Sequence, residues 1–508
     1  MLIKWEVIKL LIGDIISKTA AEKGDKIAAV LDDKKVTYQD LEKQSNQLAH
    51  GLIDLGIKPA DMVSIMLPNS IEFLTAYLGV IKSGATMVPL NISFKKAAVE
   101  YILNNSEAKI IISSKKFLPL IKDCDLDYLQ KIILVDGEKS DDYLALSELA
   151  DQQSTLPELK EIDQEYTAAC LYTSGTTGQP KGAMLTHHNL IFDTQKTIEH
   201  LKVDDSDRYI CVLPMFHAFA ETVCMLMPLF LGAEIVIVDR FLPEKVLKTI
   251  QEENVTFFAG VPTMYSALLN VKNKDEYDLS HLNLCISGGA AMPQQTMEDF
   301  EKTFNVKILE GNGPTETSPV AYVNPVDGER KSGSVGLPIP ETKVKIVDEN
   351  DKELERGKIG EIVVQGEHVM KGYFKMPEAT EKTLRGGWLH TGDLGKMDQD
   401  GYVYIVDRKK DMINVGGMNV YPREIEEQLY KHPKIREAAV VATKDELRGE
   451  IPKAVIVLKE GEKADEREIK KYCQQYFANY KVPKLVDFLD ELPKNATGKI
   501  DKKSLSDL

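Results

Sequence analysis

The feature that most restricts the fold of this 508-residue chain is an alternation of short apolar runs with helical patterns over its first 330 residues. The runs KIIIS, KIILV, EIVIV and FFAGVP lie near residues 110, 132, 235 and 258. Helical segments precede and separate these runs; in 68–84, apolar residues recur at helical spacing and Gly84 closes the pattern. Strands that are apolar throughout and alternate with helices are typical of sheets covered on both faces. We therefore expect an α/β fold of layered sheets.

The pattern changes beyond residue 330, where shorter strand-like pieces alternate with polar turns. VKIVD, GEIVVQG and GYVYIV indicate a β-rich subdomain before about residue 405. In the last hundred residues, PREIEEQLYKH starts a helix with Pro422 near its first turn, EAAVVA and KAVIVL indicate strands, and 466–480 predicts a further helix. The hydrophilic stretch DRKKDM is the best candidate for a linker between two domains. We expect a large N-terminal domain over 1–406, a hinge linker over 407–412 and a small, mobile α+β domain over 413–508.

Composition limits the class of protein. The net charge of −16 argues against a general nucleic-acid binder, which would usually be basic. The six cysteines are scattered and form no CxxC, which suits a reducing cytosol, so we expect a cytoplasmic protein. Residues 1–17 read as an amphipathic helix rather than a signal peptide, and no apolar run is long enough to span a membrane. A homodimer and peripheral membrane contact both stay open.

The segment YTSGTTGQPKG, residues 172–182, predicts a phosphate-binding loop. Glycines let backbone N–H groups approach an anion closely, and hydroxyls and a lysine add further donors and charge. The spacing is not that of a Walker A loop, because Gly182 stands where Ser or Thr would follow the lysine. The candidate phosphate ligands are Thr173, Ser174, Gly175, Thr176, Thr177, Gly178 and Lys181.

The segment GNGPTET, residues 311–317, begins as a dinucleotide motif but does not complete it. Glu316 occupies the position of the last glycine of GxGxxG, and Pro314 crowds the turn. On spacing alone, Glu316 is either a solvated turn carboxylate or a hard oxygen ligand for Mg²⁺, with Thr315 beside it facing a nucleotide.

Three further positions carry polar side chains beside glycine turns or a strand. Asp393 in GWLHTGDLG is either an acceptor for ribose hydroxyls or an ordinary loop residue. Arg408 follows an apolar strand, and without a functional role it would be interpreted as part of a surface salt bridge. Lys499, in PKNATGKIDK, would in isolation be interpreted as a solvated terminal lysine.

The segment PMFHAFAE places His217 and Glu221 four residues apart, a spacing that can hold a metal on a helix. The sequence shows neither HExxH nor a third ligand, and a lone histidine among Phe and Met is more often a packing or pocket residue. Covalent hydrolase chemistry has no support, because neither a GxSxG elbow nor a cysteine nucleophile signature occurs.

Taken in order, these motifs resemble the adenylate-forming (ANL) superfamily of acyl-CoA synthetases, luciferases and peptide-synthetase adenylation domains. The similarity runs from about residue 25 to 505, and within the superfamily the chain most resembles bacterial fatty acid–CoA ligases. The resemblance implies that ATP and a carboxylic acid give an acyl-adenylate and pyrophosphate, after which a coenzyme A thiol displaces AMP. It implies Mg²⁺ as the metal and ATP, CoA and a fatty acid as partners.

The resemblance also implies a role for each motif. The 172–182 loop wraps the β- and γ-phosphates, Glu316 binds Mg²⁺, and Lys499 bridges the acid's carboxylate and the α-phosphate. The nucleotide-site residues implied outside that loop are Gly289, Ala290, Ala291, Asn312, Gly313, Thr315, Asp393, Arg408 and Lys499. The implied catalytic residues are Lys499, Thr315, Glu316 and His217.

The remaining implied roles concern the acyl group and the motion of the small domain. His217 is a wall or gate of the acyl pocket, together with Gly288 and Gly313. The C-terminal domain rotates about a hinge at Lys410 between the half-reactions. Gly416 and Gly417 then line a tunnel for the pantetheine arm of CoA.

The chain departs from the family at Asn312, where an aromatic residue, most often tyrosine, usually stacks on adenine. We expect weaker ATP binding or looser nucleotide choice. The alternatives to a medium- or long-chain fatty acid ligase are a CoA ligase for an aryl, branched or dicarboxylic acid, and an acyl-AMP ligase that loads a carrier protein. An amino-acid adenylation module and a non-catalytic sensor fit the motifs less well.

Overall fold

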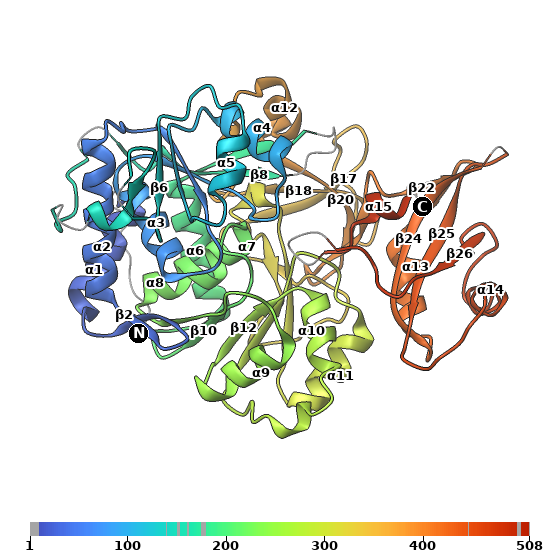
Figure 1. Cartoon of the computed structure of the whole chain (residues 1–508). Helices are drawn as coiled ribbons and strands as arrows, with labels where there is room; N and C mark the ends of the chain where they lie inside the picture. Colours follow the sequence, from blue (N-terminus) through green and yellow to red (C-terminus); the bar gives the residue numbers. More distant parts are fainter. Residues whose placement is uncertain are drawn as a thin grey trace.

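The computed structural model shows a large body that carries the N-terminus and a smaller unit, built from the last part of the chain, at one side of it (Figure 1). It describes residues 10–138, 140–149, 153–159, 162–173, 179–445, 447–494 and 499–506. The layered α/β fold predicted from the sequence is confirmed. The bounds and strand orders below refer to the described residues.

Two large sheets form the body. The first has nine strands in the order β16 (Leu337–Pro338), β15 (Tyr322–Val323), β14 (Ile308–Asn312), β13 (Leu284–Ser287), β12 (Phe257–Gly260), β10 (Arg208–Cys211), β11 (Glu234–Ile237), β1 (Ile27–Leu31), β2 (Lys34–Thr37). The second has eight, in the order β19 (Gly372–Tyr373), β9 (Lys181–Thr186), β8 (Thr167–Thr173), β4 (Thr86–Pro89), β3 (Met62–Met66), β5 (Ile110–Ser113), β6 (Lys131–Leu134), β7 (Leu144–Ala145). The strands expected near 110, 132, 235 and 258 are β5, β6, β11 and β12.

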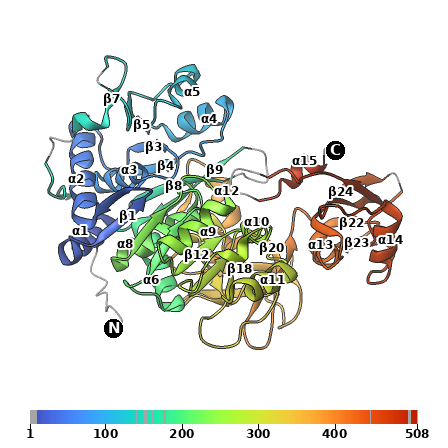
Figure 2. The same cartoon turned by 60° about the horizontal axis from the view of Figure 1, so that its bottom comes forward.

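Buried helices lie between these two sheets. Helix α3 (Ile71–Lys82), the segment predicted from its spacing, contacts β1 of the first sheet and β3 and β4 of the second. Every residue of α3 except Glu72 is buried, as expected for a helix with a sheet on each side. Helices α6 (His187–Leu201) and α8 (Met227–Leu231) pack against each other near it (Figure 2). The site is therefore built on a rigid three-layer frame.

Further helices complete the body, and some of them pack against α3, α6 or α8. They are α1 (Ile12–Lys23), α2 (Tyr38–Asp54), α4 (Lys96–Ser106), α5 (Leu118–Asp123), α7 (Ala218–Ala220), α9 (Pro243–Glu252), α10 (Pro262–Leu269), α11 (Gln294–Phe304) and α12 (Pro377–Thr383), with 3₁₀ turns η1 (Leu146–Leu149), η3 (Lys274–Glu276), η4 (Thr315–Thr317) and η5 (Arg385–Gly387) and a π-helix, η2 (Glu221–Leu226). An amphipathic helix was expected over residues 1–17. Residues 1–9 lie outside the described part, and residues 12–17 form the first half of α1. In the described part of the chain, every helix is too short or too polar to cross a bilayer.

The β-rich region beyond residue 330 is a four-stranded antiparallel sheet. Its order is β17 (Lys343–Val347), β18 (Gly360–Gln365), β20 (Leu389–Met397), β21 (Val403–Arg408). Strand β21 extends to Arg408, so the first two residues of the expected 407–412 linker belong to a strand.

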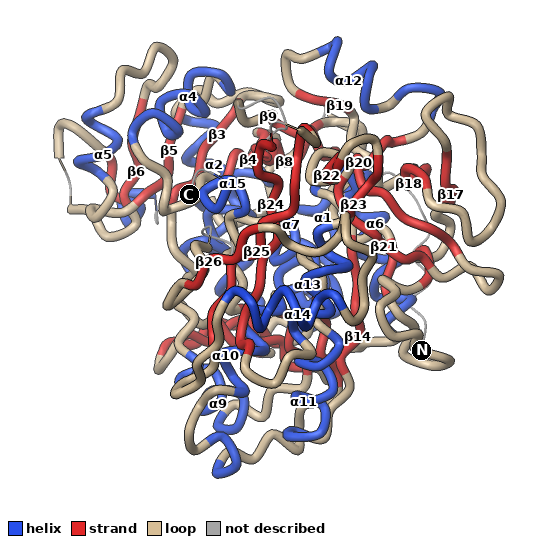
Figure 3. Tube along the Cα trace, turned by 90° about the vertical axis from the view of Figure 1, so that its right-hand side faces the viewer, coloured by secondary structure: helices blue, strands red, loops and turns tan. Residues whose placement is uncertain are grey.

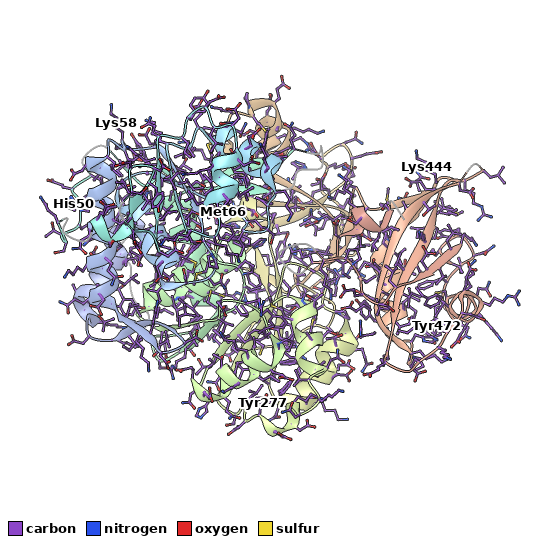
Figure 4. The ribbon with its side chains drawn as sticks, in the orientation of Figure 1. His50, Lys58, Met66, Tyr277, Lys444 and Tyr472 are labelled. Carbon is purple, nitrogen blue, oxygen red and sulfur yellow. The ribbon has the colours of Figure 1, made fainter. Side chains whose placement is uncertain are left out.

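The C-terminal unit has a sheet and a core of its own (Figure 3). Its elements are β22 (Ile413–Val415), β23 (Met418–Val420), α13 (Pro422–Tyr430), β24 (Ile435–Asp445), β25 (Gly449–Leu458), α14 (Glu466–Gln474), β26 (Leu485–Phe488) and α15 (Lys502–Ser506). The helix expected over 466–480 was too long: α14 ends at Gln474, and Phe477 packs against the core from a turn. Tyr472, labelled in Figure 4, meets His432 edge to face on this unit, with ring centroids 4.7 Å apart.

Candidate active site

The site lies where four neighbouring parallel strands of the nine-stranded sheet end. Strands β10, β12, β13 and β14 run in the same direction, so the loops that follow them leave the sheet at one edge. Ligands of open α/β sheets bind at this carboxyl edge. A small pocket there is lined by Leu213, Pro214, His217, Phe219, Val261, Gly289 and Lys499.

Three glycines at this edge lie close to their neighbours: Gly313 leaves no room for a side chain, and Gly288 and Gly289 leave little. A Cβ on Gly313 would lie 2.0 Å from the carbonyl oxygen of Pro319. A Cβ on Gly288 would lie 3.0 Å from the Phe219 ring, and one on Gly289 would lie 3.0 Å from Cε of Lys499. Gly289 also has a φ of +76°, which side chains rarely adopt. The structure thus brings Gly288 against the ring of Phe219, and Gly289 against Lys499, the lysine that the sequence singled out.

Lys499 reaches this pocket from the C-terminal unit, so it is not a solvated terminal lysine. Burial, with the cation of Arg408 adding to it and Asp393 opposing both, lowers the pKa of its ammonium to about 8. Burial thus disfavours the charged form of Lys499, and an anion bound in the pocket would favour it.

His217 faces the same pocket as a neutral ring. Its Nδ1 accepts a hydrogen bond of 3.2 Å from the backbone N–H of Phe219 at the start of α7. That nitrogen is therefore unprotonated, and the ring proton must be on Nε2. Burial, with Lys499 adding to it, lowers the pKa of the ring to about 3, so His217 stays neutral at ordinary pH. It can donate one hydrogen bond, and it is a poor general base.

Glu221 does not join His217 in a metal pair. Its Oε1 accepts a hydrogen bond of 2.9 Å from the hydroxyl of Tyr77 on α3, and its Oε2 has no partner. Burial raises the pKa of this carboxyl to about 7. A second buried carboxyl, Asp193 on α6, has a strongly raised pKa for the same reason. The sequence analysis did not detect the burial of either acid, because nothing local distinguishes them from surface acids.

Asp393 and Arg408 face each other on neighbouring strands. The β20–β21 register places them opposite one another, and Nε of Arg408 lies 3.0 Å from Oδ1 of Asp393. Asp393 is 4% exposed, whereas the Arg408 side chain is about half exposed. Burial raises the pKa of Asp393 and Arg408 opposes that rise. Arg408 is thus paired inside the site rather than on an ordinary surface, and the pair offers an acceptor and a donor group side by side.

The predicted phosphate loop connects two paired strands of the eight-stranded sheet. Thr173 ends β8, Lys181 begins β9, and the two residues are register partners across the ladder. Gly182 is required by packing, since a Cβ there would lie 2.7 Å from Sγ of Cys170. Between these strands, Ser174, Gly175, Thr176, Thr177 and Gly178 lie outside the described residues.

Glu316 lies at the centre of the 3₁₀ turn η4 that follows β14, next to Thr315. The hydroxyl of Tyr373 donates a 2.6 Å hydrogen bond to its Oε1, and the ring of Tyr373 lies 5.1 Å from Nζ of Lys181. The sequence analysis did not assign a role to Tyr373, although it stands in the run MKGYFKMPEAT.

The residues fit a magnesium ion that is shared with a bound nucleotide. Mg²⁺ is usually held by one or two carboxylates, with phosphate oxygens and waters completing its shell. Glu316 supplies one such carboxylate, half-buried, with one oxygen taken by Tyr373. Among the described residues, no three acidic, histidine or cysteine side chains gather into a cage made by the protein alone.

Other predicted residues are placed around this edge. Ala290 and Ala291 are exposed in the loop after β13. Asn312 ends β14, and its side-chain Oδ1 is buried without a hydrogen-bond partner.

The predicted tunnel and hinge residues lie apart from the pocket. Gly416 and Gly417 form the exposed turn between β22 and β23 with φ of +59° and +89°, and neither lines the pocket of Lys499. Lys410 is exposed in the turn after β21.

Comparisons with known proteins agree with this architecture. The AMP-binding enzyme model matches residues 16–374, and the model of the AMP-binding enzyme C-terminal domain matches residues 424–499. The chain is 38% identical to a long-chain-fatty-acid–CoA ligase of Bacillus subtilis (strain 168), over 97% of this chain and 93% of that protein. It is 35% identical to a ligase of the same name from Escherichia coli O157:H7, over 97% and 94%.

A solved structure extends the similarity to the whole fold. The anthranilate CoA ligase AuaEII in complex with anthranoyl-AMP superposes with a TM-score of 0.92 and 32% identity, covering 98% of this chain and 96% of that one. The chain belongs to the family of AMP-binding enzymes, and its activity is that of an adenylate-forming acid–thiol ligase.

Proposed function

We propose that this chain is an ATP- and Mg²⁺-dependent fatty acid–CoA ligase for medium- or long-chain acids, acting in the cytoplasm. The observation that carries the proposal is the burial of Lys499 beside Gly289 and His217, in the pocket at the carboxyl edge of the nine-stranded sheet. The two ligases described above, from B. subtilis and E. coli, support the acid class by their names.

In the first half-reaction, a carboxylate oxygen of the acid attacks the α-phosphorus of ATP. The bond from that phosphorus to the bridging oxygen breaks, and pyrophosphate leaves with the electron pair. Both reactants are anions, so the site must neutralise charge without blocking the line of attack. Lys499 lies between the acyl and nucleotide sides of the pocket, and bound anions would restore its full protonation.

His217 and the ribose pair position the reactants. The Nε2–H of neutral His217 donates to the acid's carboxylate and leaves the other oxygen free to attack. Asp393 accepts from ribose hydroxyls, with Arg408 beside it. The loop before Lys181 holds the outer phosphates. Mg²⁺, held by Glu316, would neutralise phosphate charge during the step.

In the second half-reaction, the thiol of CoA loses its proton and its sulfur attacks the carbonyl carbon of the acyl-adenylate. The carbon–oxygen bond to the phosphate breaks, and AMP leaves. The thiol has to approach from the side where Lys499 lies, so the C-terminal unit moves about Lys410 and takes the lysine away. Gly416 and Gly417 then border the path of the pantetheine arm, where the absence of side chains leaves room.

The acid class rests on the apolar lining and on one aromatic side chain. Leu213, Val261 and Phe219 line the described pocket beside His217 and Lys499, and these apolar side chains favour hydrocarbon next to the acid group over a second carboxylate. Phe219 lies against Gly288 and forms the wall on that side.

The test is pyrophosphate release with a panel of acids, with and without CoA. The panel holds C2 to C18 fatty acids, benzoate, anthranilate, malonate and amino acids. An optimum between C8 and C18, with turnover raised by CoA, supports the proposal. Activity confined to aryl or dicarboxylic acids overturns the acid class, and acyl-AMP that accumulates unchanged when CoA is added overturns CoA as the acceptor.

A further inference from the structure

Tyr373 contacts both Glu316 and Lys181, the charged residues proposed to bind Mg²⁺ and the outer phosphates, but it belongs to neither of their motifs. Its hydroxyl donates to Oε1 of Glu316 at 2.6 Å, and its ring lies 5.1 Å from the ammonium of Lys181. The lysine follows the phosphate loop, and the glutamate follows β14. The tyrosine is therefore the side chain that joins the charge-bearing residues of two different sheets.

The backbone around Tyr373 makes the same connection. Strand β19 pairs with β9, with Tyr373 opposite Ala183, and the N–H of Phe374 donates to the carbonyl of Gly182 at 2.8 Å. The N–H of Met370 donates to the carbonyl of Glu316 at 2.9 Å. Residues 370–374 are thus hydrogen-bonded to the start of β9, just after the phosphate loop, and to the η4 turn.

The phenol is held in a state in which it can only donate to the carboxylate. Tyr373 is 8% exposed, and an ionised carboxylate offers only acceptors, so the phenol O–H is the donor. In the described part of the chain, this bond engages Oε1 of Glu316 and leaves Oε2 available to a ligand. A hydrogen-bonded partner of this kind fixes the orientation of a metal-ligating carboxylate and typically changes metal affinity by about 10- to 100-fold.

We propose that Tyr373 is a positioning residue for the metal–triphosphate site: its hydroxyl aims the free oxygen of Glu316, and its ring holds Lys181 on the phosphate side. The inference rests on the proposed function, since it concerns the nucleotide and metal of that reaction. The two contacts of one side chain can be separated, because phenylalanine keeps the ring and leucine removes both.

The test measures nucleotide binding rather than turnover. Binding of the α,β-methylene analogue of ATP, which cannot release pyrophosphate, is followed by calorimetry at a series of Mg²⁺ concentrations and in EDTA. For Tyr373→Phe, the Mg²⁺ concentration needed for half-maximal affinity should rise by about 10-fold, with binding in EDTA unchanged. For Tyr373→Leu, affinity should fall in EDTA as well, because Lys181 loses the ring.

The matched control is Tyr77→Phe, which removes a buried tyrosine hydroxyl from the carboxylate of Glu221 (2.9 Å). It should leave the Mg²⁺ dependence unchanged, and thermal unfolding verifies that all three variants are folded. A wild-type Mg²⁺ dependence in Tyr373→Phe, or an equal shift in Tyr77→Phe, overturns the proposal while the ligase function stands. Absence of Mg²⁺-dependent binding in the wild type contradicts the ligase function itself.

Discussion

Lys499 holds its charge in surroundings that disfavour it, and this sets the expectation for its removal. Lys499→Ala should slow pyrophosphate release by about 100-fold or more, as loss of one group that stabilises developing negative charge usually does. Transfer of the acyl group from preformed acyl-AMP to CoA should be nearly unaffected, because in the proposed second step the lysine has left the site. Lys494→Ala, which removes a partly buried ion pair with Glu437 within the C-terminal unit, is the control. Equal loss in both half-reactions would contradict this separation of roles.

The lowered pKa of Lys499 also predicts a pH profile for the first half-reaction. The protonated form is the active one, and its pKa in the free enzyme is about 8. The value of kcat/KM for ATP should therefore be level below pH 7 and fall as pH rises through about 8. Asp393→Asn removes the carboxylate that supports the charge, so it should move this limb to lower pH. A wild-type profile that is flat to pH 9.5 would disprove the assignment.

Asn312 stands where the family usually has an aromatic ring, and this predicts the effect of restoring one on ATP binding. Asn312→Tyr should lower the KM for ATP by about 5-fold or more, since stacking of a base on an aromatic ring is worth roughly 1–3 kcal/mol. Steady-state measurement of pyrophosphate release against ATP concentration tests it, with Asn312→Ala as the variant that gains no ring. An unchanged or raised KM in the tyrosine variant would contradict the stacking argument.

At the scale of elements, the π-helix η2 brings a carboxyl into the layer between the sheets. Glu221 has a pKa of about 7 in the folded chain, above the ordinary value near 4.5. The folded state therefore binds its proton more tightly than the unfolded state, so the free energy of unfolding should decrease as pH rises from 4.5 through 7. Glu221→Gln keeps an acceptor for Tyr77 and removes the titration. Urea unfolding should show it more stable than wild type by about 1–3 kcal/mol at pH 8, and by much less at pH 5.

Elements with a strong local pattern could be predicted, and so could most of the site. Helix α3 and strands β5, β6, β11 and β12 follow from apolar spacing, because their burial requires apolar residues at nearly every position. Glycine and hydroxyl runs marked the loop before Lys181 and the turn at Glu316. Tyr373 and the buried acids could not be found this way, since their partners are 57 or more residues away in the chain. The end of α14 was missed because Phe477 reaches the same core from a turn.

At the scale of the whole molecule, Arg423 ties the C-terminal unit to the body. It lies on α13, is 9% exposed, and its Nη1 donates to the carbonyl of Ile405 on β21 at 2.8 Å. It also faces Glu310 on β14. Burial raises the pKa of that carboxyl to about 7, and the charge of Arg423 opposes the rise. The contact therefore holds the unit in the arrangement that places Lys499 in the pocket.

Loss of that contact should affect the half-reactions unequally. Arg423→Met should slow pyrophosphate release several-fold, because the arrangement with Lys499 in place is less populated. Acyl transfer from added acyl-AMP should keep its rate. Arg436→Met, whose guanidinium bonds the carbonyl of Asp490 within the C-terminal unit, should change neither step. Rapid-quench measurement of each step separates these outcomes, and parallel slowing of both would contradict the role.

The place of Arg408 at the end of β21 has a consequence for the fate of the intermediate. The chain turns at Lys409 immediately after the residue paired with Asp393, so the proposed pivot begins where the ribose contact stops. In the proposed motion, the body can keep the AMP portion of the intermediate bound while the C-terminal unit moves away. An acyl-adenylate is readily hydrolysed, and in this arrangement it passes from one step to the next without being set free. Little of each ATP should be wasted as leaked acyl-AMP, even when CoA is scarce.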